Sequence, residues 1–199
     1  DVHVKRSAAI KIAGKRGHVH IVRELLALTG DRMPDIHDGA ILAALCRSGD
    51  LDLVQQHIVG NSLSKHSVRG YGDECVSSAC GSGSQELVQW LLSLHGEQSM
   101  RLSGPNMRSF EEVCRSGNTQ LVRLLLDLES ESGAGCSGTD AVTPTIVDAS
   151  FCIACSAGHV DVVLLLLSIE GTLRVNVHAW REMAFQKACR YGHLEVVRL

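Results

Sequence analysis

The chain has 199 residues, a formal net charge of -3 from 19 basic and 22 acidic residues, and an aromatic content of only 4%. This balance gives no overall attraction to nucleic acid or to an anionic membrane, so nucleic acid is disfavoured as a partner. No apolar run reaches the roughly 18 residues of a membrane-spanning helix, and we expect no membrane insertion.

The chain repeats itself around six glycines. Each glycine is followed directly by a polar residue, and an apolar pair occupies the fourth and fifth positions after the glycine. The glycines are Gly17, Gly49, Gly83, Gly117, Gly158 and Gly192, at spacings of 32, 34, 34, 41 and 34 residues. A fixed period in this range is typical of a repeat array, in which each repeat contacts only its neighbours. The copies are called repeats 1 to 6, and position -3 is the residue three before the repeat glycine.

Each repeat is predicted to fold as two short helices with the glycine between them. In repeat 5, Phe151, Ala154 and Cys155 fall on one face of a first helix, and the run from Val162 to Leu167 forms a second, longer helix. Glycine suits a left-handed helix end, and the polar residue after it can cap the next helix or bond its neighbours. Helices of about 8 and 11 residues are marginal alone in water, so stacking has to stabilise them.

The last repeat, Ala188-Cys-Arg-Tyr-Gly-His-Leu-Glu-Val-Val-Arg-Leu199, resembles the ankyrin-repeat core Ala-Ala-x-x-Gly-His-x-x-Val-Val-x-x-Leu-Leu. The resemblance covers essentially the whole chain as six copies, without the family's Thr-Pro-Leu-His opening. It implies an all-α, ankyrin-like helix-turn-helix repeat solenoid formed by residues 1–199 as a single array. It also implies that each histidine directly after a repeat glycine hydrogen-bonds the backbone of the adjacent repeat. These are His18, His159 and His193.

The two ends predict a piece of a longer array. The chain does not begin with Met, and Asp1-Val2-His3 matches Asn176-Val177-His178 inside the array. Leu199 falls within a predicted second helix, where a capping repeat with a polar outer face is expected.

One junction is irregular. Between Gly117 and Gly158 the chain has seven residues more than the period of 34, in a segment rich in Gly and Ser. We expect a flexible insertion over residues 129–148, either a tolerated surface loop or part of a binding face, with Cys136 as an exposed thiol. Residues 60–74, which contain three glycines, are expected to form a second soft junction.

Eight cysteines invite a disulfide or metal interpretation, and their register argues against both. Five of them occupy position -3: Cys46, Cys80, Cys114, Cys155 and Cys189. Neighbouring repeats lie about 10 Å apart, whereas a disulfide needs Cα atoms within about 7 Å, so we expect a reduced, packed column. Cys152 and Cys155 form a Cys-x-x-Cys without the second pair of a zinc site, so we expect no metal. Reduced thiols indicate an intracellular reducing compartment: cytoplasm, nucleus or an organelle interior.

The candidate binding residues lie at the ends of the first helices. Position -2 is basic in four of six repeats, and with its neighbours it gives the candidate set Lys15, Arg16, Arg47, Arg115, Arg190 and Tyr191. Stacking would align these residues into a basic stripe that meets an acidic segment of a partner protein. The helix dipole alone also favours basic residues near a helix C-terminus, which is the simpler interpretation.

No Ser-His-Asp, Cys-His, His-Glu-x-x-His or phosphate-loop pattern is present, so we expect no enzyme and no cofactor. The predicted function is a protein–protein interaction scaffold or adaptor with no chemistry of its own. Two alternatives stay open: a permanent structural subunit of a large multiprotein assembly, and the targeting arm of a longer enzyme. A redox or zinc role of Cys152 and Cys155 is the outside alternative.

Overall fold

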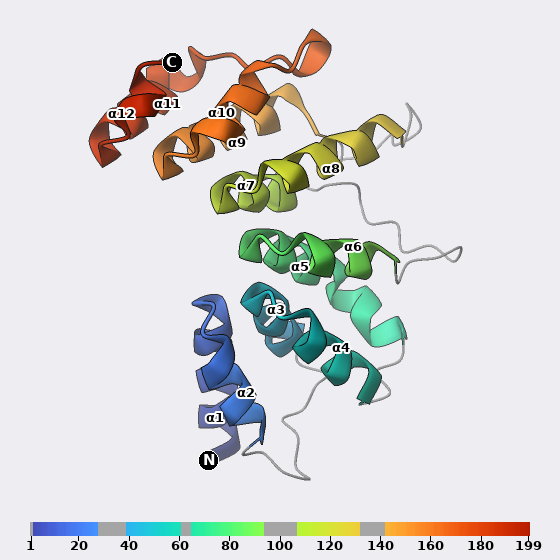
Figure 1. Cartoon of the computed structure of the whole chain (residues 1–199). Coiled ribbons are helices and arrows are strands. Elements are labelled where there is room, and N and C mark those ends of the chain that lie inside the picture. The colour runs from blue at the N-terminus through green and yellow to red at the C-terminus, as the bar shows by residue number, and fades with distance from the viewer. Residues whose placement is uncertain (1, 28–38, 61–64, 94–106, 132–141) are drawn as a thin grey trace. The chain divides into compact units, whose positions relative to one another are not determined.

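The computed structural model describes residues 2–27, 39–60, 65–93, 107–131 and 142–199, and within these residues every regular element is a helix (Figure 1). The chain divides into two compact halves, Asp1–Met100 and Arg101–Leu199. Repeats 1 to 3 lie in the first half and repeats 4 to 6 in the second. Among the described helices, none combines the length and apolarity that a membrane span requires.

The N-terminal half contains three helix pairs, each turning at its repeat glycine. The pairs are α1 (Val2–Lys15) with α2 (Val19–Ala27), α3 (Gly39–Ser48) with α4 (Leu51–Gly60), and α5 (Lys65–Ser82) with α6 (Gln85–Ser93). The first helices pack side by side, α1 on α3 and α3 on α5. Each second helix packs on the first helix of its own repeat.

The C-terminal half repeats this arrangement. Its pairs are α7 (Met107–Ser116) with α8 (Thr119–Glu131), α9 (Pro144–Ala157) with α10 (Val160–Leu167), and α11 (Ala179–Tyr191) with α12 (Leu194–Val197). A short 3-10 helix, η2 (Gly171–Leu173), lies between α10 and α11. In this half the first helices form one layer and the second helices another. α7, α9 and α11 pack in order, and so do α8, α10 and α12.

Two recurring positions contribute to the core of each half. Position -4 is buried in all six repeats, by Ala13, Leu45, Ala79, Val113, Ala154 and Ala188. Position +5 is buried in repeats 1 to 5, by Val22, Val54, Val88, Val122 and Val163. Burying one Val or Leu side chain stabilises the fold by about 1.5–3 kcal/mol, so the predicted apolar periodicity is also the main source of packing energy.

In repeat 5 the predicted helix lengths are wrong, because the first helix is the longer one. α9 has 14 residues and α10 has 8. α9 begins early because Thr143 caps it, its Oγ1 accepting from the backbone N–H of Ile146 at 3.3 Å, and because Pro144 presets a helical φ at the first turn. A longer first helix places more residues against the first helices of the neighbouring repeats.

The structure also corrects the predicted range of the flexible insertion. Residues 129–131 belong to α8 and residues 144–148 belong to α9, so both ends of the predicted 129–148 segment are helical. Residues 132–141, including Cys136, lie outside the described residues. The predicted soft junction at 60–74 is also wrong for residues 65–74, because α5 runs through Gly70 and Gly72. An interior glycine costs a helix only about 1 kcal/mol, which a long helix tolerates.

α11 opens with an unusual turn. Trp180, Arg181 and Glu182 have φ of 49°, 59° and 63°, in the left-handed region that costs a non-glycine residue about 1–2 kcal/mol. The carboxylate of Glu182 lies 2.6 Å from Nδ1 of His178, and Gln186 Nε2 donates to the Arg181 carbonyl at 2.8 Å. The right-handed part of α11 therefore begins at Met183.

Candidate functional site

All six repeat glycines adopt the left-handed conformation that ends a first helix. Their φ values lie between 69° and 78°. Glycine reaches this region without the steric cost that a Cβ imposes, which explains why it recurs at each helix end. The prediction of a left-handed helix end at each glycine is confirmed, and the turn brings position +1 close to the end of the first helix.

At three repeats the residue at position +1 caps the second helix, as predicted. The carboxylate of Asp50 accepts from Leu53 N–H at 3.1 Å, and the Asn118 side-chain oxygen accepts from Leu121 N–H at 3.1 Å. Ser84 Oγ accepts from the N–H of Leu87 at 3.4 Å. These acceptors satisfy backbone donors that a helix start otherwise leaves unpaired.

At two other repeats position +1 is a histidine that links its repeat to the preceding one. His159 Nε2 lies 2.9 Å from the Arg115 carbonyl, and His193 Nε2 lies 3.0 Å from the Ser156 carbonyl. A carbonyl only accepts, so Nε2 carries the proton and donates in both cases. Arg115 and Ser156 both occupy position -2. The backbone contact implied by the resemblance is therefore present at His159 and His193, and we call it the histidine link.

The histidine link also explains the glycine that it covers. A Cβ added to Gly117 would lie 2.6 Å from Nδ1 of His159, and one added to Gly158 would lie 2.4 Å from Nδ1 of His193. Both distances are too short for real contacts, so the glycine is required by the imidazole of the next repeat as well as by its own φ. Gly192 has the same φ of 77° and nothing within 4 Å of such a Cβ.

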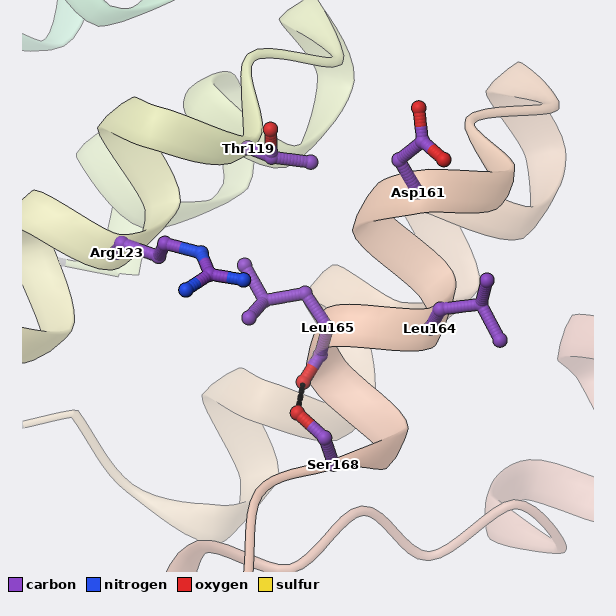
Figure 2. Close-up of a pocket in the computed structure, with 6 residues that line it drawn as sticks. All are labelled: Thr119, Arg123, Asp161, Leu164, Leu165 and Ser168. Atoms are coloured by element: carbon purple, nitrogen blue, oxygen red, sulfur yellow. Dashed lines mark hydrogen bonds between the residues drawn. The ribbon is translucent and has the colours of Figure 1, made fainter.

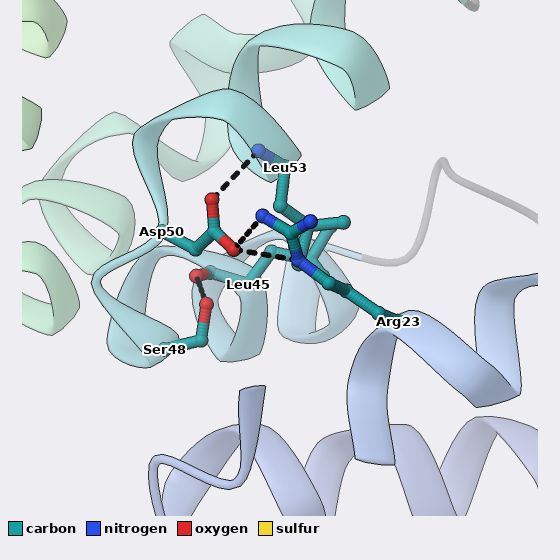
Figure 3. Close-up of polar contacts among 5 residues, drawn as sticks. All are labelled: Arg23, Leu45, Ser48, Asp50 and Leu53. Carbon is teal, nitrogen blue, oxygen red and sulfur yellow. Dashed lines mark hydrogen bonds and ion pairs between the residues drawn. The ribbon is translucent and has the colours of Figure 1, made fainter. Parts of the chain in front are cut away.

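Between repeats 1 and 2 an ion pair makes the connection instead (Figure 3). Arg23 on α2 donates through Nε to Asp50 Oδ2 at 2.8 Å, and one terminal nitrogen of its guanidinium contacts the same oxygen. Asp50 therefore caps α4 with one oxygen and binds the preceding repeat with the other. Sequence reasoning missed this pair, and the available signal was the opposite charge at Arg23 and Asp50.

The six candidate binding residues lie at first-helix ends as predicted, with different surroundings. Lys15, Arg16, Arg115, Arg190 and Tyr191 are exposed, whereas Arg47 is half-buried. Lys15 and Arg47 occupy position -2 on α1 and α3, which pack against each other. In the C-terminal half α9 lies between α7 and α11 and carries Ser156 at this position. The basic residues thus neighbour each other in repeats 1 and 2, and Ser156 separates Arg115 from Arg190.

Two contacts modify this surface. Arg115 pairs with Glu112 at 2.9 Å, where the arginine side chain is 55% exposed and the carboxylate is 11% exposed. This contact offsets part of the positive charge at repeat 4. The rings of Tyr191 and His193 lie 6.4 Å apart at 36°, so Tyr191 stands beside the histidine link at the end of α11. Sequence reasoning missed both contacts, although opposite charges three residues apart on a predicted helix were an available signal for Glu112 and Arg115.

A second candidate is a shallow cavity of about 340 Å³ between α8 and α10. It is lined by Thr119, Arg123, Asp161, Leu164, Leu165 and Ser168 (Figure 2). The guanidinium of Arg123 points from α8 toward Leu165, and Ser168 Oγ donates to the Leu165 carbonyl at 2.6 Å. A lining of one cation, one anion and two hydroxyls suits a polar side chain of a partner better than an apolar small molecule.

Four of the five cysteines at position -3 are buried as predicted: Cys46, Cys80, Cys114 and Cys155. Burial raises the pKa of Cys114 and of Cys155 to about 12, the second also through Cys152. A hydrogen bond to Cys75, followed by burial, raises the pKa of Cys46. Thiols held protonated are poor nucleophiles and poor metal ligands.

The prediction is wrong for Cys189, which is exposed, because no described residue covers this face of α11. All seven described cysteines are free thiols. Within the described part of the chain, no group of three His, Cys, Asp or Glu side chains is placed to hold a metal ion.

The chain matches no protein-family model and no curated protein. Any function assigned to it depends on its own geometry. The left-handed glycine recurs in all six repeats, a linking residue at +1 is present in three (Asp50, His159 and His193), and an exposed basic residue at -2 in three (Lys15, Arg115 and Arg190).

Proposed function

We propose that the chain is an ankyrin-like repeat scaffold that binds an acidic segment of another protein and has no chemistry of its own. The six left-handed glycines at near-regular spacing support the repeat assignment, and so does the histidine link. An array of pre-ordered helices loses little conformational freedom when a partner binds, which favours recognition over a large surface.

The proposed binding surface depends on one observation: at position -2 the main chain and the side chain have different roles. The main-chain carbonyl of Arg115 accepts the histidine link, while the Arg115 side chain stays 55% exposed. The structural connection therefore uses the backbone. The side chain pairs with Glu112 at 2.9 Å and still keeps more than half of its surface exposed to a partner. Arg190 and Lys15 are exposed at equivalent helix ends.

Charge reversal tests this surface. We expect the Arg47→Glu, Arg115→Glu, Arg190→Glu triple variant to bind a fluorescent Glu-rich peptide more weakly than the wild type, measured by anisotropy at low and moderate salt. Exposed ion pairs contribute about 0.2–1 kcal/mol each, so three losses predict an affinity lower by roughly threefold to a hundredfold.

The matched control reverses three exposed arginines that do not lie at the C-terminal ends of the first helices: Arg108→Glu, Arg174→Glu and Arg181→Glu. It changes the net charge by the same amount and should retain most of the affinity. Equal weakening in both triple variants would mean that the peptide senses only overall charge, and the proposed surface would be wrong.

A further inference from the structure

Two buried thiols meet at the junction between repeats 2 and 3. Cys46 lies on α3 and Cys75 lies on α5, two helices that pack side by side in the N-terminal half (Figure 1). Their side chains are 0% and 1% exposed, and their sulfurs are in hydrogen-bond contact. The hydrogen bond favours the protonated form of Cys46, so the Cys46 thiol donates and the Cys75 sulfur accepts.

This contact follows from the register of the repeats. Cys46 occupies position -3, and Cys75 occupies position -8, the residue eight before its repeat glycine. In the C-terminal half the same two positions bring Cys114 on α7 beside the hydroxyl of Ser150 on α9. Of the five junctions between consecutive repeats, only the one between repeats 2 and 3 has cysteine at both positions. The spacing that separates neighbouring cysteines at position -3 does not separate this pair, because its members come from different positions.

We infer that Cys46 and Cys75 form a reversible disulfide when the chain meets a peroxide, and that this bond fastens repeat 2 to repeat 3. The sulfurs have to move from hydrogen-bond contact to about 2.05 Å, a shift that two adjoining helices can make. The bond closes a loop between residues that are 29 positions apart in the sequence. In the reduced chain the junction keeps its hydrogen bond and its packing.

The reaction balances with one hydrogen peroxide as the oxidant. Cys46 keeps its proton as the hydrogen-bond donor, so the first attack comes from Cys75. Cys75 loses its proton and its sulfur attacks one peroxide oxygen; the O–O bond breaks, the leaving hydroxide takes up a proton as water, and Cys75 becomes a sulfenic acid. Cys46 then attacks the Cys75 sulfur, the S–O bond breaks, and the leaving hydroxide takes the thiol proton as a second water. The two sulfurs together lose two electrons, which the peroxide accepts.

Burial controls the rate of this reaction. Buried, protonated thiols are poor nucleophiles, so the first step waits for a local opening of the contact between α3 and α5. The second step needs no further access, because closing the contact brings the two sulfurs together again. Oxidation of the pair should therefore be slower than oxidation of a solvent-exposed thiol.

Peroxide treatment of the full chain tests the inference. In a Cys136→Ser, Cys189→Ser background, which limits links between molecules, hydrogen peroxide should lower the mass of the chain by two hydrogen atoms. Peptide mapping without reduction should recover the Cys46 peptide joined to the Cys75 peptide, and dithiothreitol should release both. The link should also lower the equilibrium constant for urea unfolding by roughly 30-fold or more, the usual effect of closing a loop of this size.

Two variants and one condition serve as controls. Cys75→Ser installs the residue type found at position -8 in repeats 4 and 5, so circular dichroism should show a folded chain. In this variant peroxide should neither link Cys46 nor stabilise the chain. Ser150→Cys gives Cys114 a partner at the equivalent junction and should add a second link. Oxidation of the chain unfolded in concentrated urea should mix the pairings, because the fold no longer selects one.

Peptide binding is not a readout of these experiments, so their result leaves the proposed function to its own test. A folded chain in which Cys46 and Cys75 stay unlinked after peroxide treatment would overturn the inference. So would a completed link that leaves the urea unfolding curve unchanged.

Discussion

At the residue scale, Gly158 and His193 show how one position satisfies two demands. Gly158 takes a left-handed φ to end α9, and it leaves room for the imidazole that connects repeat 6 to repeat 5. Gly117 and His159 do the same one repeat earlier. The φ requirement is readable from sequence because it is local. The ring above the glycine is not, because it comes from 35 residues further along the chain for Gly158 and from 42 residues further along for Gly117.

Alanine substitution separates the two demands. Gly192→Ala should lower the free energy of unfolding by about 1 kcal/mol, the cost of a left-handed alanine. Gly158→Ala has the same φ cost and must also displace His193, losing a hydrogen bond worth about 1 kcal/mol and disturbing the packing around it. Urea denaturation of both variants checks this. If they lose equal stability, the imidazole does not constrain the glycine.

The cysteines at position -3 also show that burial cannot be predicted from the local sequence alone. The period predicted burial for every member, and Cys114 and Cys155 fit. Cys189 has the same sequence context and is exposed, as Phe185 is, because burial depends on a neighbouring repeat and not on the residue's own pattern. The basic candidates at position -2 were placed correctly on helix ends, but the Glu112 partner of Arg115 was not foreseen.

At the element scale, the helix–glycine–helix order was predictable and the helix lengths were not. The glycines and the apolar periodicity locate all six turns. The starts of the first helices depend on weaker signals, such as Thr143 followed by Pro144, and were placed too late in repeat 5. The left-handed turn at Trp180–Glu182 has no sequence signal of the usual kind, since none of its residues is glycine.

The start of α9 is testable by removing its cap. Thr143→Ala should destabilise the chain by about 1 kcal/mol, because the Ile146 N–H loses its acceptor at the helix start. Thr145→Ala is the matched control, an exposed threonine in the first turn, and should change stability by less than about 0.5 kcal/mol. Thermal or urea unfolding measures both. Similar losses in the two variants would show that Thr143 does not set the helix boundary.

At the scale of the whole molecule, buried thiols recur in both halves and connect stability to pH. Burial raises the pKa of Cys114 from 9.0 to about 12, so the folded chain keeps a proton that the unfolded chain releases. This stabilisation is complete below pH 9 and is lost as the pH rises toward 12. Cys155 shifts in the same direction, for the same main reason.

We therefore expect the free energy of unfolding to fall above pH 9, by up to about 1.4 kcal/mol per pH unit for each such thiol. Urea unfolding of the wild type and of Cys114→Ala at a series of pH values measures this, and the variant should show the shallower decline. Cys189→Ala, at the exposed position, should follow the wild type. Parallel curves for the wild type and Cys114→Ala would mean that Cys114 ionises as easily when folded.

The histidine link has one more consequence. Its acceptor is a main-chain oxygen that all amino acids possess, so the bond places no demand on which side chain stands at position -2. Ser156 and Arg115 already serve equally well in this role. The side chains at position -2 can therefore change, in evolution or in the laboratory, while the hydrogen bonds between these repeats stay intact.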